Sequence, residues 1–267
     1  MSTVKGVSLV AAGSARLHVE LTGQGPEVLL VPGAGGDAGQ YTELAKVLAQ
    51  SHTVVSYDRR NNARSPQQPD WAETSIEQQA GDVIALLDAL GIDRCGVYGN
   101  STGAVIALAA VLRAPSRFSG AVLHEPALLS VLADPSDAMA SIQPVIAAGV
   151  QEGGLAGGAE AFVRFAAGEA SALLPPDVVE RLRANARILL EVEFGAFSGW
   201  KPEPQALAAL KIPLTVLSAE ETAPFFVEAA TWIAGHAGVQ LDKVPGGHMG
   251  FLDHPLELAA AIRAATA

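Results

Sequence analysis

The chain has 267 residues, of which 49% are hydrophobic, and a formal net charge of −11. This length and composition predict one large α/β core with an insertion, without an independently folding second domain. The acidic balance argues against nucleic acid and against an anionic membrane as partners, because neither offers a counter-charge. No apolar stretch approaches the ~20 residues that cross a bilayer, and residues 7–12 are too short for a signal peptide, so we expect a soluble cytoplasmic protein.

The sequence offers no motif for a metal or a nucleotide. It contains no Cys/His metal spacing, P-loop, heptad pattern or internal repeat, so we expect neither a metal nor another cofactor. Its single cysteine, Cys95, has no partner for an internal disulfide and lies in an apolar strand pattern. A reduced thiol in such a pattern behaves as a small hydrophobic side chain, which predicts that Cys95 is buried.

In chain order, short β-branched runs alternate with longer runs rich in alanine and leucine. This alternation is typical of a mostly parallel twisted sheet with helices on both faces. The predicted strands lie at residues 16–21, 27–31, 53–57, 95–98, 120–124, 214–217 and 240–244. The predicted helices lie at residues 37–50, 74–90, 104–112, 225–234 and 255–265.

About 75 residues separate the predicted strand 120–124 from the next apolar strand, which is too long for an ordinary connection. We interpret residues 127–200 as a helical cap inserted into an α/β core formed by residues 1–126 and 201–267. Helical patterns occur near residues 159–167 and 176–193. The pairs Gly153-Gly154 and Gly157-Gly158 indicate hinges or helix breakers, and a flexible surface loop is the alternative interpretation.

The pentapeptide Gly99-Asn100-Ser101-Thr102-Gly103 lies between a predicted strand and a predicted helix. A Gly-x-Ser-x-Gly pattern in this context indicates a nucleophilic serine on a sharp, strained turn, because the glycines let strand and helix approach without Cβ clashes. The turn directs the Ser101 hydroxyl toward solvent at the amino end of a helix, where a developing oxyanion is favoured. The pattern alone is weak, and the alternative is a solvated serine in a glycine-rich loop.

A serine hydroxyl needs a base within hydrogen-bond reach, and histidine has the appropriate pKa. Four of the six histidines lie within or beside predicted strands and helices, and we interpret them as structural: His18, His52, His124 and His236. His248 follows the last strand in a Pro-Gly-Gly-His loop, at the sheet edge where Ser101 is also predicted to lie. We therefore expect His248 to be the base, with His254 as the alternative.

A serine elbow followed by an acid and then a histidine, on a sheet of this kind, resembles the α/β-hydrolase superfamily, and the resemblance covers essentially the whole chain. It implies the α/β-hydrolase fold with an inserted helical cap. Within the superfamily the chain is most similar to the zearalenone lactonases. The segments that carry this likeness are Val31-Pro32-Gly33-Ala34-Gly35-Gly36, His124-Glu125 and Val244-Pro245-Gly246-Gly247-His248.

The acid that would orient His248 has two candidates. The commoner superfamily position follows the strand 214–217 and corresponds to Glu221, whereas the lactonase likeness points to Glu125, one strand earlier. A carboxylate at either strand end can face the same imidazole, where it fixes the tautomer and stabilises the imidazolium. We prefer Glu125 and keep Glu221 as the alternative. Glu125 could also merely pair with a helix end or cap the turn before Pro126.

The resemblance also implies an oxyanion hole built from the backbone N–H groups of Thr102 and Ala34. Here Pro32-Gly33 replaces the His-Gly often found in the superfamily, which leaves a backbone donor intact. Alternatively, the glycines of this segment only allow a tight turn and form no part of an oxyanion hole.

The charged loop that contains Asp58, Arg59, Arg60 and Arg64 is expected to be a structural brace without a catalytic role. Three aromatic residues near the end of the cap could line an apolar substrate pocket or simply pack: Phe194, Phe197 and Trp200.

Together these features predict a cofactor-free serine hydrolase that cleaves a carboxylic ester or a lactone through an acyl-enzyme, with a small hydrophobic substrate. A simple carboxylesterase and a peroxide-using relative without a cofactor are alternative enzymes. A ligand-binding receptor on the same scaffold is the alternative from another class, because this fold hosts many functions. We expect no nucleic-acid or membrane partner, and a homodimer remains open.

Overall fold

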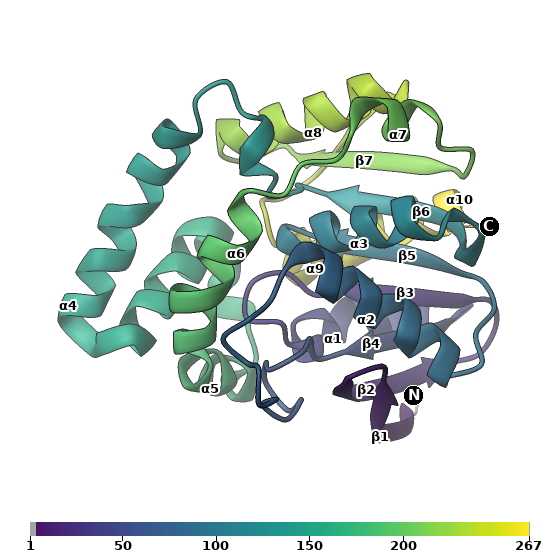
Figure 1. The fold of residues 1–267 in the computed structure, drawn as a ribbon, viewed down its shortest axis with the longest axis horizontal. Helices are drawn as coiled ribbons and strands as arrows, with labels where there is room; N and C mark the ends of the chain where they lie inside the picture. The colour runs from purple at the N-terminus through teal and green to yellow at the C-terminus, as the bar shows by residue number, and fades with distance from the viewer. Residues whose placement is uncertain (1–3, 267) are drawn as a thin grey trace.

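Eight strands form one sheet in the computed structural model, which describes residues 4–266 (Figure 1). The spatial order is β1-β2-β4-β3-β5-β6-β7-β8. Strand β2 pairs antiparallel with β1 and β4, and the pairs from β4 to β8 are parallel. The strands are β1 (Val4–Ala12), β2 (Ala15–Gly23), β3 (Glu27–Val31), β4 (Thr53–Tyr57), β5 (Cys95–Asn100), β6 (Phe118–His124), β7 (Leu214–Ala219) and β8 (Leu241–Val244). The prediction of a mostly parallel sheet is confirmed.

The first strand was not predicted. Strand β1 forms a hairpin with β2, in which Ala12 pairs with Ala15, and Gly13 in the turn has a φ of +59°. Glycine adopts this left-handed conformation without a Cβ penalty. Val7 and Leu9 of this edge strand are exposed, so the strand lacks the buried apolar run by which the central strands were recognised.

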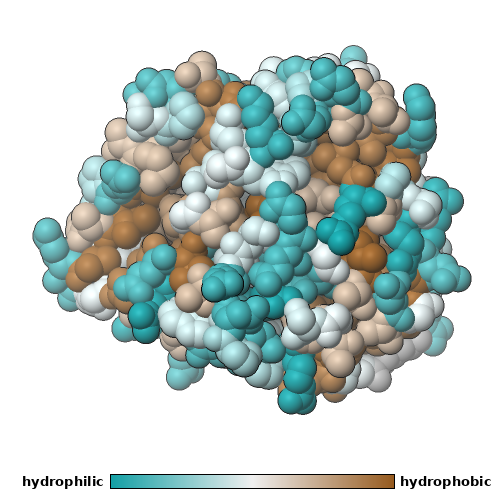
Figure 2. All heavy atoms as spheres, viewed as in Figure 1, coloured by the Kyte–Doolittle hydropathy of each residue, from teal (hydrophilic) through white to brown (hydrophobic). Residues whose placement is uncertain are grey.

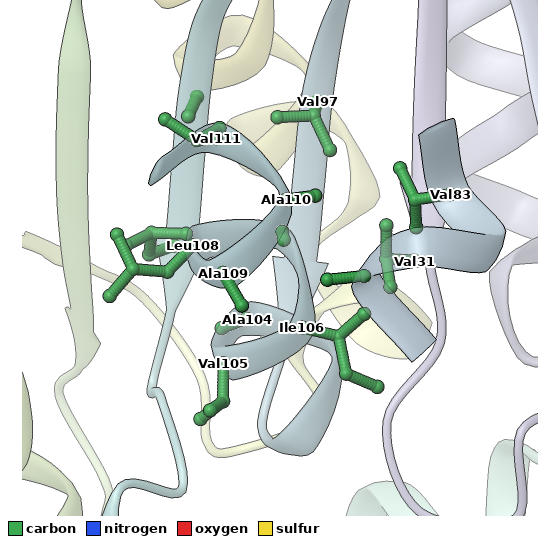
Figure 3. Packing of buried hydrophobic residues seen from close by; sticks show 14 of the residues in the cluster. Val31, Val83, Val97, Ala104, Val105, Ile106, Leu108, Ala109, Ala110 and Val111 are labelled. Carbon is green, nitrogen blue, oxygen red and sulfur yellow. The ribbon is translucent and has the colours of Figure 1, made fainter. Parts of the chain in front are cut away.

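Helices cover both faces of the sheet, as predicted. One face carries α2 (Ile76–Ala89), α3 (Thr102–Arg113) and α8 (Pro224–Ala237), and the other carries α1 (Thr42–Leu48), α9 (Gly250–Asp253) and α10 (Pro255–Thr266). Side chains of the parallel strands alternate between the two faces, because successive residues of a strand point to opposite sides. In Figure 3, Ala110 and Ile106 of α3 pack among Val97, Val31 and Val83.

The centre of the sheet is tightly filled. Cys95, the first residue of β5, is 2% exposed, in agreement with its predicted burial. Burial raises the pKa of its thiol to about 12. The thiol is therefore protonated at neutral pH and behaves as part of the core.

Helices and single turns occupy the long connection between β6 and β7. Most of them lie at one end of the sheet (left in Figure 1), and the last helix packs against α8. They are η3 (Leu129–Val131), α4 (Pro135–Ala167), η4 (Gly168–Leu173), α5 (Pro176–Ala184), the π-helical turn η5 (Ile188–Glu193), α6 (Phe194–Ser198) and α7 (Pro204–Ala208). We call residues 129–198 the helical insertion. None of these residues contributes a strand to the sheet.

The two glycine pairs of the insertion behave differently. Gly153 and Gly154 have non-helical dihedral angles and break α4 into two arms, as one of the two interpretations predicted. Gly157 and Gly158 stay helical, so they do not break the helix. A Cβ on Gly157 would lie 2.3 Å from the carbonyl oxygen of Gly149, so this glycine allows the two arms to pack closely.

One face of the molecule carries its apolar area in scattered patches. On the face drawn in Figure 2, hydrophobic side chains form separate patches between hydrophilic ones. Within residues 4–266, none of the helices combines the length and hydrophobicity needed to span a bilayer.

Candidate active site

Three sequence-predicted residues reach the same edge of the sheet from different strands. Ser101 follows β5, Glu125 follows β6, and His248 lies in the loop after β8. Strands β5 to β8 are parallel, so their carboxyl ends share one edge, where ligands bind in open α/β sheets.

Ser101 occupies a strained turn between β5 and α3. Its φ of 57° and ψ of −127° are unusual for a residue with a side chain. A Cβ on Gly99 would lie 2.3 Å from the carbonyl oxygen of Gly103, and a Cβ on Gly103 would lie 2.1 Å from the carbonyl oxygen of Val31. Both glycines are therefore needed for the close approach of strand and helix, for the steric reason that the sequence suggested.

His248 is hydrogen-bonded to Glu125 and not to Glu221. Its Nδ1 lies 2.7 Å from Glu125 Oε2. The other carboxylate oxygen of Glu125 accepts the N–H of Ala219 at 2.8 Å, and the Thr222 hydroxyl donates to Oε2 at 2.8 Å. Glu221 lies in the same loop as Thr222, but it is exposed. The backbone φ of 48° at Glu125 makes the sharp bend that turns this side chain away from β6.

The environment of Glu125 favours its ionised form. Burial alone would raise the pKa of this carboxyl, but the hydrogen bonds from His248 and Ala219 and the charge of His248 outweigh burial and lower it. Phe226 of α8 stacks on the imidazole of His248, with ring centroids 3.9 Å apart and planes 15° apart. The ring of His248 is therefore held at its edge by Glu125 and on one face by Phe226.

A second layer of polar contacts lies beneath these residues. The side-chain amide of Asn100 donates to the carbonyl oxygen of His248 at 2.8 Å, which anchors the histidine loop to the end of β5. His124 is fully buried, and its Nδ1 lies 3.1 Å from the Tyr98 hydroxyl. Burial lowers the pKa of His124 to about 4, so this histidine is neutral at physiological pH.

Ser101 and His248 line one small cavity of about 20 Å³, together with Ala34 and Asn100. Within residues 4–266, no hydrogen bond joins the Ser101 hydroxyl to the imidazole of His248. The two groups therefore face a shared space without a hydrogen bond between them in the described residues.

The two residues expected to supply the oxyanion donors, Ala34 and Thr102, also lie beside Ser101. Gly33 packs against the elbow, since a Cβ on it would lie 3.1 Å from the Cβ of Ser101. Ala34 and Thr102 line a cavity together with Ser101. Among the described residues 4–266, neither the N–H of Ala34 nor that of Thr102 donates a hydrogen bond. Two free donors therefore border the space beside the serine.

This second cavity has a volume of about 70 Å³ and is largely aromatic. Six phenylalanines line it: Phe162, Phe165, Phe194, Phe197, Phe225 and Phe226. Phe194 and Phe197 occupy the place that the sequence suggested. Trp200 does not line the cavity; it packs against the core on the α3 side of the sheet. Trp200 therefore follows the alternative interpretation, in which this side chain only packs. It lies after residue 198, where the helical insertion ends.

His248 also lines a larger, more polar cavity of about 620 Å³. Its lining includes Glu221, Thr222 and His254, so the alternative acid and the alternative base both border this space. Ala166 of α4 lines all three cavities and separates the aromatic cavity from the polar one. Within residues 4–266, no three His, Cys, Asp or Glu side chains are grouped so that they could hold a metal ion.

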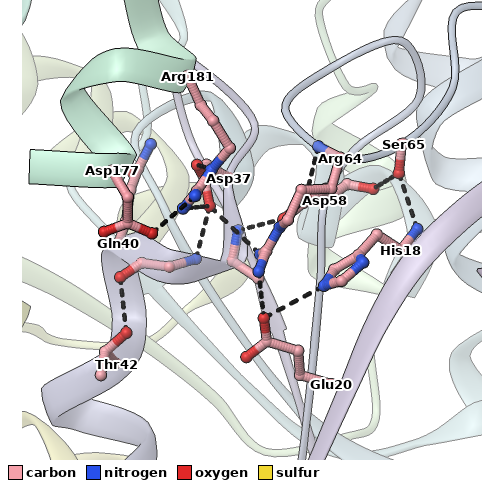
Figure 4. A network of polar contacts seen from close by, with 12 residues as sticks. His18, Glu20, Asp37, Gln40, Thr42, Asp58, Arg64, Ser65, Asp177 and Arg181 are labelled. Atoms are coloured by element: carbon pink, nitrogen blue, oxygen red, sulfur yellow. Dashed lines mark hydrogen bonds and ion pairs between the residues drawn. The ribbon is translucent and has the colours of Figure 1, made fainter. Parts of the chain in front are cut away.

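The charged loop after β4 forms a brace between the core and the insertion (Figure 4). Asp58 is fully buried and accepts from the guanidinium of Arg64 at 2.7 and 2.8 Å. Arg181 of α5 donates to Asp37 at 2.5 Å. Arg60 forms a buried pair with Asp82 of α2. None of these three arginine and aspartate pairs includes Ser101 or His248.

Several residues of the site were not found from the sequence. Thr222 was obscured by the neighbouring acids, which offered more obvious chemistry. Asn100 and Phe226 act through a backbone carbonyl and a ring face, and residue type alone does not signal either contact. Phe162 lies on α4, whose path over the site depends on the break at Gly153-Gly154.

The sheet order, the elbow and the histidine loop define an α/β-hydrolase fold. A family model described as "alpha/beta hydrolase fold" matches residues 26–156. The chain superposes on the carboxylesterase CesB of Bacillus subtilis with a TM-score of 0.78 at 19% identity, over 99% of this chain and 91% of that one. At this identity, the likeness concerns the fold alone.

Two characterised or named relatives resemble the chain in sequence. It is 29% identical to zearalenone hydrolase of Bionectria ochroleuca over 89% of each chain. It is also 38% identical to the uncharacterised hydrolase YraK of Bacillus subtilis, over 44% of each chain, so that alignment spans less than half of this relative. The predicted resemblance to the zearalenone lactonases is thus confirmed as a sequence similarity.

Proposed function

We propose that this protein hydrolyses carboxylic esters or lactones through an acyl-enzyme formed on Ser101. The observation that carries the proposal is the 2.7 Å contact between His248 Nδ1 and Glu125 Oε2 at a cavity that Ser101 also lines. The contact leaves Nε2 of His248 as the nitrogen for proton transfer, because Nδ1–H is held by the carboxylate. Substrate binding would close the gap between Ser101 and His248, since catalytic hydrogen bonds are often long in the empty site.

In the first half of the reaction, Ser101 Oγ attacks the carbonyl carbon and its proton passes to His248 Nε2. The negative charge on the carbonyl oxygen is stabilised by the N–H groups of Ala34 and Thr102 at the amino end of α3. The tetrahedral intermediate then breaks its bond to the alkoxy oxygen, which takes the proton from His248. A water molecule, deprotonated by His248, attacks the acyl-enzyme and releases the acid.

The cavities suggest where each half of the substrate lies. The aromatic cavity adjoins Ser101 and both oxyanion donors, so it suits an apolar acyl group. The polar cavity adjoins His248, which protonates the leaving group, so it suits the departing alcohol. A macrolactone needs more room than about 70 Å³, so we expect the helical insertion to move when a large substrate binds.

The similarity to zearalenone hydrolase favours a lactone substrate, whereas the cavity favours esters with a slim apolar acyl chain. Turnover of p-nitrophenyl esters of increasing acyl length, compared with ring opening of zearalenone, separates the two. Steady lactone opening supports a lactonase. Ester turnover without lactone opening supports a simple carboxylesterase.

The nucleophile is tested with a fluorophosphonate probe. We expect the wild type and Ser119→Ala, a serine of β6 outside the site, to be labelled in one-to-one ratio and Ser101→Ala to remain unlabelled. Equal labelling of wild type and Ser101→Ala would refute the assignment. A single burst of p-nitrophenol without a steady state would instead favour a ligand-binding protein.

A further inference from the structure

Arg59 connects the turn that carries Ala34 to the helical insertion. Its guanidinium is fully buried and forms a two-point ion pair with Glu193, with both N–O distances at 2.7 Å. Glu193 ends the π-helical turn η5, lies 134 positions further along the chain and is only 3% exposed. Asn62 also donates to Glu193, at 2.9 Å. A pair this deeply buried holds its two partners firmly in place, because either charge alone would be strongly unfavourable.

The same guanidinium also binds the backbone of the turn. Its Nε donates to the carbonyl oxygen of Pro32 at 3.1 Å, and its Nη2 donates to that of Gly33 at 3.0 Å. Nε also donates to the Gly33 oxygen, at 3.3 Å, and the N–H of Gly36 donates to the same oxygen at 3.1 Å. Glu193 compensates the burial of Arg59 and keeps its pKa above the usual value, so the guanidinium stays charged.

The carbonyl of Gly33 and the N–H of Ala34 belong to one peptide unit. The described chain contains no cis peptide bond, so this unit is planar and its C=O and N–H point in opposite directions. Fixing the Gly33 oxygen on Arg59 therefore directs the Ala34 N–H away from Arg59. On the next peptide, the Gln40 amide donates to the Ala34 oxygen at 2.8 Å. Both carbonyls around Ala34 are held, and its N–H is left free beside Ser101.

We propose that Arg59 and Glu193 are positioning residues that orient the Ala34 N–H as an oxyanion donor and make this orientation depend on docking of the helical insertion. The inference rests on the proposed function, because it assigns a task to the Ala34 N–H in ester cleavage. A cation on the Gly33 oxygen also polarises the peptide, which strengthens its N–H as a donor. The brace after β4 thus has a part that acts on the site.

The test compares Glu193→Gln with Asp82→Asn. Asp82 forms the other buried arginine pair of this loop, with Arg60 at 2.7 and 2.8 Å, and Arg60 does not bind Pro32 or Gly33. Both variants should lower thermal stability. Only Glu193→Gln should lower kcat, by about 10- to 100-fold with KM within about threefold, because a misdirected donor loses part of the 10²–10³-fold typical for one oxyanion hydrogen bond. Affinity for an aryl trifluoromethyl ketone, which mimics the tetrahedral intermediate, should fall by the same factor.

A second readout does not depend on activity. The backbone ¹⁵N order parameter of Ala34 should fall from about 0.85 to below about 0.6 in Glu193→Gln and stay unchanged in Asp82→Asn. If Glu193→Gln does not fold, Arg59→Lys replaces it, since a single ammonium cannot bind Glu193 and both carbonyls together. A rigid Ala34 in the folded variant, or an equal loss of kcat in Asp82→Asn, would overturn the inference. If the wild type turned over no ester, the proposed function would be refuted. The order parameter of Ala34 would still show whether Arg59 and Glu193 fix the orientation of its N–H.

Discussion

Glu125 and His248 meet through one 2.7 Å hydrogen bond although 123 positions of the chain separate them. The contact forms because β6 and β7 pair in parallel and Glu125 still donates its backbone N–H to Leu217 of β7. The carboxylate is thereby brought toward the loop after β8. The geometry around Glu125 leads to the first prediction.

Glu125→Gln should lower kcat by about 10³- to 10⁴-fold, because a carboxamide can neither stabilise the imidazolium nor hold the required tautomer of His248. Glu221→Gln should leave kcat within about twofold, since Glu221 is exposed. Steady-state kinetics on a p-nitrophenyl ester measures both. Loss of kcat in Glu221→Gln alone would reverse the choice of acid.

The aromatic cavity should set the acyl preference. Phe194→Ala removes a ring that lines the cavity. This ring packs edge-on against that of Phe162, with ring centroids 4.8 Å apart. The ratio of kcat/KM for octanoate to that for acetate should rise by at least about tenfold, in line with the 10- to 200-fold that one methylene contributes in such pockets. Trp200→Ala is the matched control and should leave the ratio unchanged. An equal shift in both variants would mean that the cavity does not hold the acyl chain.

The elbow should not tolerate a single added methyl group. In Gly103→Ala, the new Cβ would lie 2.1 Å from the carbonyl oxygen of Val31, so β3 and α3 would have to separate, with an expected loss of more than about 3 kcal/mol. Gly81→Ala in α2 meets no atom within 4 Å and should instead stabilise by about 0.5–1 kcal/mol. Urea unfolding monitored by circular dichroism compares the two. Similar stabilities would show that the turn has more space than described.

The buried His124 should make stability depend on pH. Burial lowers the pKa of His124 to about 4 in the folded chain, whereas the unfolded side chain binds a proton below its usual pKa of 6.5. The unfolded state therefore takes up the proton first, and stability is lost as the pH falls from 6.5 to 4, by up to ~3 kcal/mol.

Urea unfolding between pH 4 and 7 should show this loss in the wild type and in His236→Asn, which changes an exposed histidine of α8. His124→Asn should flatten the curve above pH 4.5. Glu125, whose pKa is lowered from 4.5, contributes only at more acidic pH, where its protonation removes the bond to His248. If the free energy of unfolding of His124→Asn fell with pH as steeply as that of the wild type, His124 would be excluded as the cause.

The sequence predicted the parts of this fold that depend on local patterns. The central parallel strands are rich in buried apolar residues, and the elbow around Ser101 carries its own steric requirement for two glycines. Strand β1 escaped prediction because it is an exposed edge strand with no continuous apolar run. The choice between Glu125 and Glu221 stayed open for a different reason: two neighbouring parallel strands deliver both residues to one edge, and only the bend at Glu125 and the register of β7 bring one of them to His248.

Contacts that depend on tertiary packing were out of reach of the sequence. The pairing of Arg59 with Glu193 joins the loop after β4 to a π-helical turn, and nothing in either segment marks the other as its partner. The path of α4, which places Phe162 over Ser101, follows from close packing at Gly149 and Gly157. The position of Trp200 depended on where the insertion ends, and element boundaries are the least reliable part of a sequence-based prediction.

The burial of Cys95 provides a built-in reporter of unfolding. Its thiol lies at the start of the central strand β5, is 2% exposed and has a raised pKa, so an alkylating reagent reaches it only after the structure around it has opened. Because the chain has only this one cysteine, the fraction of molecules that gain the mass of one alkyl group over time reports opening without any engineered label. The rate constant for iodoacetamide on the native protein, divided by that on the unfolded chain, therefore gives the free energy of opening at the start of the strand that carries the elbow.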